Sequence, residues 1–353
     1  MHLPSVVRPL FIVTAFVILM VGLHFAAAVI IPLLLSAFFA SLLYPFYGAL
    51  VRRRVPSVVA LLLSAALLIG VFVFLVVLVG YSIDTMMASL DTLDAQLAQR
   101  QEELQTTVAN LPQSSALQKA LSNFSPTALV NLFKTMLGAV ISIGEVSLII
   151  LIVTAFLLVE ASQFRKRMVR AFGADHPVTT KTLALVRVFI RYFGLRTIVN
   201  AITGLGMTVI LWLMGVPYAP LWGILMFFMS YIPYLGIMIA LVPPLILTYA
   251  EYGAAMALLL VVLTVVVNAV AENIVSPIIM GKGLSVSPTI VFLSFIFWMW
   301  LMGGSAAFIA MPLTMAVLMI MAGFEETQRW VSMVATIPLP IVGPATTEQA
   351  EGG

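Results

Sequence analysis

The sequence predicts an all-α polytopic integral membrane protein with about 7–8 membrane segments, including broken or re-entrant helices in its carboxyl-terminal half and one amphipathic helical segment outside the membrane. Two observations lead to this class. Of 353 residues, 62% are hydrophobic and 9% are charged, whereas soluble domains carry about 25% charged residues. Apolar runs of about 20 residues or more, the length of a spanning helix, recur along the chain.

The first apolar run covers residues 9–50, which is too long for one bilayer crossing. His24 and Pro32 mark the expected turn between two spans, and the basic turn at residues 52–54 precedes a third. The run lacks a small-residue cleavage site, so we interpret it as a retained helix rather than a signal peptide. The three expected spans are residues 9–28, 30–50 and 55–82.

Residues 84–135 are more polar and carry more acidic than basic side chains. Leu90, Leu93 and Leu97 recur at helical spacing, which predicts a pair of amphipathic helices outside the membrane. Such a stripe is more often a packing face than a partner-binding surface. A fourth span is expected after this segment, at residues 137–160.

A basic segment follows at residues 161–196. Lys and Arg accumulate in cytoplasmic loops, so this segment, the turn at 52–54 and both chain termini are expected in the cytoplasm, with residues 84–135 outside. Residues 177–192 combine basic and apolar side chains at helical spacing, which is typical of an interfacial helix.

Residues 197–323 are interpreted as a transport core with interrupted helices. After a span near 197–214, the blocks 219–250 and 287–322 are each too long for one straight span. Helices broken at membrane depth persist where the freed backbone groups are buried in protein or line a cavity, and transporters often bind solutes there. The expected breaks or hinges are Pro233, Gly236, Pro277, Gly281, Gly303 and Gly304, with Pro243, Pro244 and Pro312 as further interruptions. The predicted organisation is spans one to three in 1–83, the outer segment 84–135, span four in 136–160, the basic segment 161–196, the core 197–323 and a partly disordered cytoplasmic tail at 324–353.

Polar residues interrupt the hydrocarbon sequence between Asn268 and Lys282. An ionisable residue at membrane depth is costly, which makes a functional site the first hypothesis. Glu272 is expected to hydrogen-bond a solute or to carry a coupling proton, while neutral side chains supply further donors and acceptors. The candidate binding or coupling residues are Glu272, Asn268, Asn273, Ser276, Tyr231, Tyr234 and Arg196.

Several chemistries lack their sequence motifs. The chain has no His-Glu-x-x-His zinc motif, no Gly-rich loop ending in Gly-Lys-Ser/Thr and no Gly-x-Ser-x-Gly elbow. Cysteine is absent and the 3 His are scattered, so neither a metal nor a cofactor is expected. A net charge of +3 is too small to suggest nucleic acid as a partner. We therefore do not expect an enzyme.

Short motifs occur in a fixed order along the chain. They are Leu23-His-Phe-Ala-Ala-Ala28, Tyr44-Pro45, Arg54-Val-Pro56, Ile202-Thr-Gly204, Trp222-Gly223, Tyr231-Ile-Pro233, Ser276-Pro277 through Gly283, and Phe295 through Leu313. In this order they resemble the autoinducer-2 exporter family over residues 5–325. The resemblance implies a multi-pass protein of the bacterial inner membrane that exports a small polar signal of the furanone type. Other members of that family are assigned sodium or lithium/proton antiport.

The chain departs from the family pattern at two positions that bear on charge. Family members commonly carry Glu-Pro where this chain has Ser276-Pro277. Glu272 lies one helical turn earlier on the same face, and either replaces that carboxylate or is an unrelated acid. Arg196 stands where the family usually has Lys, and because arginine does not readily lose its proton, proton shuttling there is disfavoured.

Three functions stay open from the sequence. Export of a small polar solute by alternating access is favoured by the resemblance and by the neutral polar groups near Glu272. Sodium or lithium/proton antiport needs a buried acid as ion ligand, and Ser276 in place of the family Glu disfavours it. A membrane scaffold would use residues 84–135 to recruit partners. Besides the lipid bilayer, the expected partner is a second copy of the chain, because Gly and Ala surfaces favour helix association in membranes.

Overall fold

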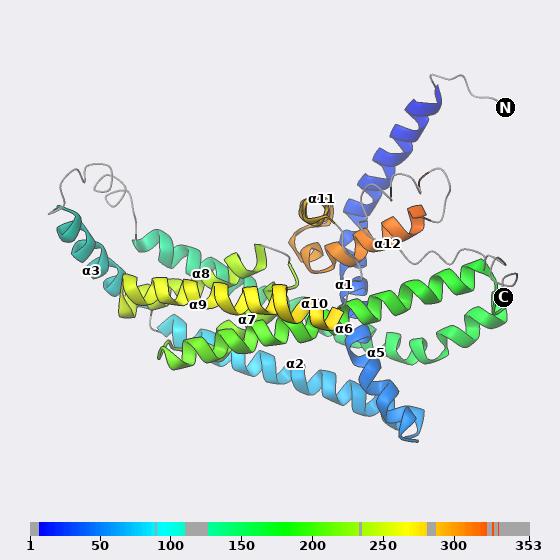
Figure 1. Ribbon diagram of the computed structural model, residues 1–353, viewed down its shortest axis with the longest axis horizontal. Coiled ribbons are helices and arrows are strands. Elements are labelled where there is room, and N and C mark those ends of the chain that lie inside the picture. The colour runs from blue at the N-terminus through cyan, green and yellow to red at the C-terminus, as the bar shows by residue number, and fades with distance from the viewer. Residues whose placement is uncertain are drawn as a thin grey trace, which may run out of the picture. The chain divides into compact units, whose positions relative to one another are not determined.

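The computed structural model describes residues 7–88, 90–109, 126–232, 235–280 and 287–322, together with Thr327 and Val331. Every element in these ranges is helical, which confirms the all-α class (Figure 1). Five of the described helices are long and apolar enough to cross a membrane, or six if bent α5 counts as one span, and shorter apolar helices accompany them. The elements are α1 (Val7–Arg52), α2 (Ser57–Ala88), α3 (Leu90–Ala109), α5 (Pro126–Phe172), α6 (Pro177–Leu213), α7 (Ala219–Met229), α8 (Leu235–Tyr252), α9 (Ala254–Val270), a π-helical segment (Ala271–Val275), α10 (Ser276–Met280), α11 (Pro288–Met302), a 3-10 helix (Gly304–Ile309) and α12 (Ala310–Ala322).

α1 is one continuous helix of 46 residues, so the expected turn at His24 and Pro32 is wrong. A proline inside a helix removes one backbone hydrogen bond, whereas ending a helix frees the last four carbonyls. In hydrocarbon, where water cannot replace lost hydrogen bonds, the smaller loss favours continuity. At about 1.5 Å per residue, α1 is about 69 Å long, more than twice the hydrocarbon thickness of about 30 Å.

Two other helices run through the boundaries expected from composition. α5 has 47 residues, from Pro126 to Phe172, so it extends well beyond the expected span 137–160. It bends by 54° between Leu148–Ala161 and Gln163–Phe172. α6 has 37 residues and joins the expected interfacial helix 177–192 to the span after it. A change from polar to apolar side chains leaves backbone hydrogen bonds intact, so it marks depth in the membrane and not the end of a helix.

Part of the predicted organisation lies outside the described residues. This holds for residues 110–125 of the outer segment and for most of the tail 324–353. The division of the chain into functional segments stays a prediction.

The chain packs into two compact units, described here one at a time. The first comprises residues 1–65, 149–195 and 280–353. In it, α1 packs against α11 and the 3-10 helix, and α11 packs against α12. α11 ends at Gly303, whose φ of 92° is in the left-handed region that favours glycine. His24 Nδ1 donates a hydrogen bond of 2.7 Å to the Leu301 carbonyl beside this end.

The second unit comprises residues 66–148 and 196–279. In this unit, α8 packs against both α7 and α9. The hydrophobic core of the unit contains Trp222, Met226 and Leu260. The chain leaves helical geometry between α7 and α8. The predicted interruption at Pro243 and Pro244 is wrong, because both prolines lie inside the continuous helix α8.

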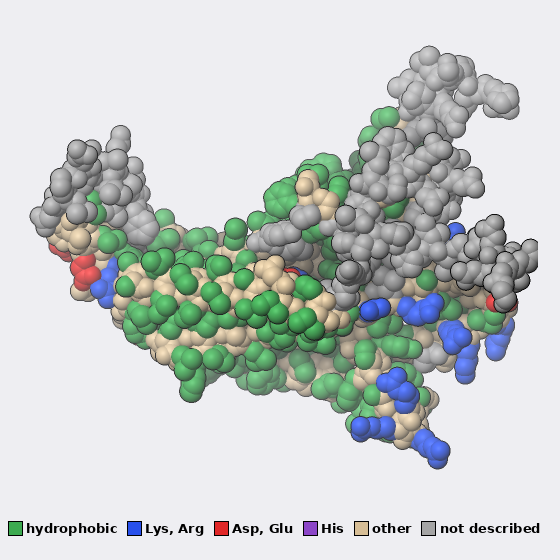
Figure 2. All heavy atoms as spheres, viewed as in Figure 1, with side chains coloured by type: hydrophobic (Ala, Val, Ile, Leu, Met, Phe, Trp, Pro, Cys, Tyr) green, Lys and Arg blue, Asp and Glu red, His purple; other side chains and the backbone are tan. Residues whose placement is uncertain are grey.

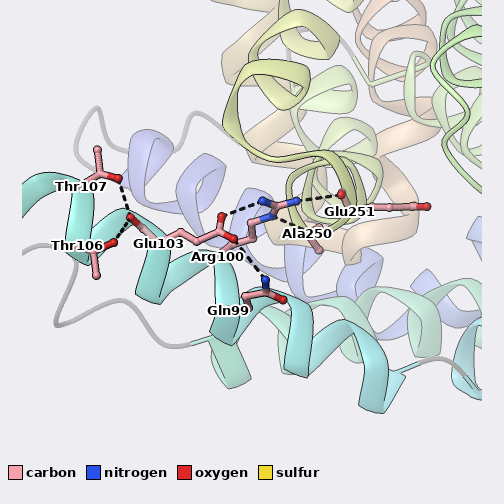
Figure 3. Close-up of polar contacts among 7 residues, drawn as sticks. All are labelled: Gln99, Arg100, Glu103, Thr106, Thr107, Ala250 and Glu251. Carbon is pink, nitrogen blue, oxygen red and sulfur yellow. Dashed lines mark hydrogen bonds and ion pairs between the residues drawn. The ribbon is translucent and has the colours of Figure 1, made fainter.

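The outer helix α3 also belongs to this second unit. Leu90, Leu93 and Leu97 are buried in its core. Arg100 reaches the end of α8, where Nε donates to the Ala250 carbonyl at 3.3 Å and Nη2 donates to the Glu251 carbonyl at 3.1 Å (Figure 3). The leucine stripe is therefore a packing face, which leaves it unavailable for recruiting a partner.

α6 and α7 approach each other through glycines. A Cβ added to Gly223 would lie 1.7 Å from Thr208 Oγ1 and 2.6 Å from the Gly204 carbonyl oxygen. Small residues allow such close approach between helices in a membrane, where dispersion contacts drive association. This contact fixes α7 against the half of α6 that follows Arg196.

Candidate functional site

Arg196 on α6 connects two irregular segments of the second unit. Its Nη1 lies 2.8 Å from Glu272 Oε1 and 2.9 Å from Oε2. Its Nη2 donates to the Ser230 carbonyl at 2.7 Å. The arginine side chain is 12% exposed and that of Glu272 is 33% exposed, so the pair is partly removed from solvent.

The Ser230 carbonyl is available because α7 ends beside it. Tyr231 N donates to the Phe228 carbonyl and Ile232 N to the Met229 carbonyl, so the last turn tightens. Terminal carbonyls of a helix lack helical partners and carry partial negative charge, which favours a cation. The Arg196 guanidinium supplies both the charge and the donor.

Gly236 is required where the chain re-enters helix after this break. A Cβ there would lie 1.8 Å from the Met229 carbonyl oxygen. Only glycine lets α8 begin this close to the end of α7.

Glu272 lies on a π-helical segment between α9 and α10. Pro277 follows on α10 and cannot donate a backbone hydrogen bond, and in a regular α-helix its ring would collide with the carbonyl of Asn273. A wider π turn directly before the proline relieves that conflict, and such turns are frequent at functional sites. The local sequence therefore explains why the helix is irregular where the acidic side chain stands.

Tyr231 and Thr197 extend the polar region beside the ion pair. Tyr231 is buried, and its hydroxyl lies 2.6 Å from Thr197 Oγ1, within hydrogen-bonding distance. The Phe227 ring meets the Tyr231 ring edge to face, with centroids 5.7 Å apart. The tyrosine hydroxyl is thus held in place by one polar and one aromatic neighbour.

Asn200 lies one turn after Arg196 on α6 and is completely buried, with 0% exposure. Neither its amide nitrogen nor its amide oxygen has a hydrogen-bond partner in the described part of the chain. Thr264 on α9 donates to Met207 Sδ at 3.5 Å, so α6 and α9 run antiparallel between that contact and the Arg196–Glu272 pair. Asn200 falls in the stretch that these two contacts bracket.

We refer to Arg196, Thr197, Asn200, Tyr231 and Glu272, with the Ser230 carbonyl, as the polar cluster. It offers a cation, a carboxylate, hydroxyls and an unpartnered amide within a largely apolar helix bundle. Across the ranges that the structure describes, no three His, Asp or Glu side chains gather as metal ligands would. The arrangement is suited to hydrogen-bonding a small polar molecule.

Residues 13–325 match the sequence profile of the AI-2E family transporters. The chain belongs to this family. A Haemophilus influenzae relative, provisionally named a transport protein, is 29% identical over 336 residues, covering 94% of this chain and 97% of the relative. The AI-2 transport protein TqsA of Escherichia coli K12 is 28% identical over 301 residues, covering 85% and 88%. YhhT of the same organism, also provisionally named a transport protein, is 30% identical over 302 residues, covering 84% and 85%. Membership confirms the family resemblance and a multi-pass membrane transporter.

In this AI-2E family transporter, the structure brings together three of the predicted site residues, Arg196, Tyr231 and Glu272. Asn268 is half-buried on α9, one turn before the acid, and Asn273 is exposed. Ser276 is half-buried on α10, Pro277 is exposed there, Gly303 and Gly304 belong to the first unit, and Pro233, Tyr234 and Gly281 lie outside the described residues.

Sequence reasoning missed Asn200, Thr197 and the Ser230 carbonyl. A signal for the first was present, because Asn200 is a lone amide four residues after Arg196 in an apolar run. Residues four apart share a helix face, so the pair could have been predicted as one polar site. The carbonyl was not predictable from residue type, since every residue carries one and only the break at α7 frees it.

Proposed function

We propose that this AI-2E family transporter exports a small polar solute of the autoinducer-2 type from the cytoplasm by alternating access, and that the polar cluster binds the solute. The observation that carries the proposal is the unpartnered amide of Asn200, which is fully buried. Buried polar side chains are nearly always hydrogen-bonded, so such an exception calls for a ligand or a bound water. A solute with hydroxyl and carbonyl groups can both donate to and accept from an amide.

The comparison with relatives supports the same solute class. TqsA is named an AI-2 transport protein, and its match covers 85% of this chain. The polar cluster lies within the matched family region, residues 13–325.

Sodium or lithium/proton antiport is the second candidate, and the ion pair disfavours it. Both Glu272 oxygens lie within 2.9 Å of Arg196 Nη1, so the carboxylate is already neutralised by a permanently charged guanidinium. A sodium ion at this position would have to displace that guanidinium. Antiport through Glu272 therefore requires the pair to open first.

The proposed orientation in a bacterial inner membrane follows the basic residues. The turn at 52–54 and the basic residues of α5 and α6 are placed in the cytoplasm, and α3 on the outer side. Because α1 is continuous, we propose that it crosses the membrane once, with its first residues on the outer side instead of the cytoplasmic side expected from the sequence. The cytoplasmic carboxyl terminus and the homo-oligomer stay predictions.

The test is flux in sealed proteoliposomes containing the purified transporter. Vesicles loaded with autoinducer-2 are compared with vesicles exposed to a sodium gradient and carrying a pH-sensitive dye, and protein-free vesicles serve as the control. We expect protein-dependent release of autoinducer-2 and no sodium-driven pH change. Sodium-driven proton movement without release of the signal would overturn the proposal in favour of antiport.

A further inference from the structure

The first unit contains a cavity that transport through the polar cluster does not use. Its volume is about 480 Å³, within the range of about 300–1,000 Å³ that small-molecule sites occupy. Polar and basic side chains from the end of α1, the start of α2 and the second half of α5 line it. They are Tyr47, Ser57, Gln163, Lys166, Arg167 and Arg170.

The cavity lies where three helices change from apolar to polar sequence. α1 ends at Arg52, α2 begins at Ser57, and α5 bends by 54° before Gln163. On the apolar side, Val58 and Leu62 of α2 are exposed, as expected for residues that face lipid. Tyr side chains such as Tyr47 are enriched at this boundary, where the ring is apolar and the hydroxyl is wet. The cavity is therefore at headgroup depth.

The charge around the cavity is positive and incompletely neutralised. Arg167 pairs with Glu160 and donates to Gln163 Oε1 at 3.2 Å. Lys166 and Arg170 take part in no ion pair formed within the described ranges. Figure 2 shows Lys and Arg side chains gathered at the end of α1 and along α5 and α6, with little acidic surface between them.

The start of α2 adds donors to this charge. Ser57 is its first residue, and the first turn of α2 contains no acidic side chain. Backbone N–H groups in the first turn of a helix lack helical acceptors and favour an anion. Together with Lys166 and Arg170, they are suited to a phosphate group.

We propose that this cavity binds the phosphate of an anionic phospholipid headgroup on the cytoplasmic side of the membrane. Lys166 and Arg170 supply the two uncompensated charges, and the hydroxyls of Tyr47 and Ser57 supply hydrogen bonds. A free phosphate ion shares this chemistry. The headgroup is the source that the position favours, because the acyl chains attached to it can run along the exposed apolar side of α2.

The test uses calorimetry to measure binding of short-chain phosphatidylglycerol to the purified, delipidated full-length transporter in neutral detergent. Parallel titrations use short-chain phosphatidylcholine and inorganic phosphate. We expect saturable binding of phosphatidylglycerol, at least about tenfold tighter than phosphatidylcholine. Equal affinity for the two lipids would overturn the proposal. Binding of inorganic phosphate as tight as that of phosphatidylglycerol would overturn the lipid source and assign the cavity to a free anion.

A pair of variants locates the site. In Lys166→Gln/Arg170→Gln, affinity for phosphatidylglycerol should fall about thirtyfold, given the usual contribution of each basic side chain near an anionic lipid. Arg165→Gln is the matched control, because Arg165 is exposed on the same helix but does not line the cavity. An equal loss in the control would show only a general positive field and would reject the cavity as the site. The wild-type lipid comparison needs no variant, so it decides the matter even if the double variant unfolds.

Discussion

The Arg196–Glu272 ion pair allows a sharp test of the polar cluster through the substitution Glu272→Gln. Glutamine has almost the same shape and keeps an oxygen that can accept from Arg196 Nη1, but it removes the negative charge. Arg196 keeps its bond to the Ser230 carbonyl at 2.7 Å. The variant should therefore fold with its helices intact while the guanidinium loses its counter-charge.

The size of the effect follows from burial. Exposed ion pairs contribute about 0–1 kcal/mol, and opening a fully buried pair costs about 3–5 kcal/mol. With Arg196 12% and Glu272 33% exposed, the pair falls between these limits, at about 1–3 kcal/mol. If solute binding or release depends on this pair, flux should drop about tenfold to a hundredfold, since about 1.4 kcal/mol corresponds to a factor of ten.

The measurement is autoinducer-2 flux at equal protein per vesicle over a range of pH. Glu251→Gln is the matched control, because this acid is exposed at the end of α8 and engages Arg100 through its backbone carbonyl. Its flux should equal that of the wild type. Wild-type flux in the Glu272 variant at every pH would remove the carboxylate from the mechanism, and an equal loss in the control would make the effect nonspecific.

Three further outcomes are expected. Asn200→Leu should raise the unfolding free energy by about 1–2 kcal/mol, because it removes an unpartnered buried amide. The same variant should have no solute flux. A stabilised variant with normal flux would show that this amide binds no solute. In a thermal unfolding assay, Gly223→Ala should lower the unfolding free energy by about 1–3 kcal/mol, because the added carbon collides with Thr208. The control Gly194→Ala should be neutral or slightly stabilising, because no atom lies within 4 Å of its added carbon. Arg100→Gln should speed amide hydrogen exchange in α3 and leave exchange in α9 unchanged, because the lost bonds join α3 to the end of α8; unchanged exchange in α3 would show that its buried leucines alone hold it.

The class of fold was predictable from composition, but the ends of the helices were not. Pro32 was expected to mark a turn, and Pro243 and Pro244 an interruption, yet all three lie inside continuous helices. In an apolar environment a proline that loses one hydrogen bond is tolerated more easily than a helix end that exposes several carbonyls. The chain leaves α-helical geometry at Gly303, whose positive φ is uncommon for residues with a side chain. Glycine at a required backbone angle was the better indicator of a break.

The candidate site was predictable where charge stood out against hydrocarbon. Arg196 and Glu272 were both recognised, but their pairing across 76 positions needed the packing of α6 against the irregular end of α9. Asn200 was overlooked because its importance lies in what its amide lacks, and only the packed structure shows which partners are absent. Local sequence could identify the charged and polar side chains. Whether each of them has a hydrogen-bond partner depends on residues distant in the chain.

The position of Arg196 has a consequence for the proposed alternating access. Its guanidinium contacts the end of α7 through the Ser230 carbonyl and the π-helical segment through Glu272, so one side chain holds two irregular segments together. A solute that hydrogen-bonds the Ser230 carbonyl or Glu272 would compete with the guanidinium, so Arg196 would no longer connect the two segments. Because arginine keeps its proton, its bonds to the segments would break by exchange of hydrogen-bond partners and not by deprotonation. Under the proposed function, solute binding and movement of the two segments would be coupled through this one residue.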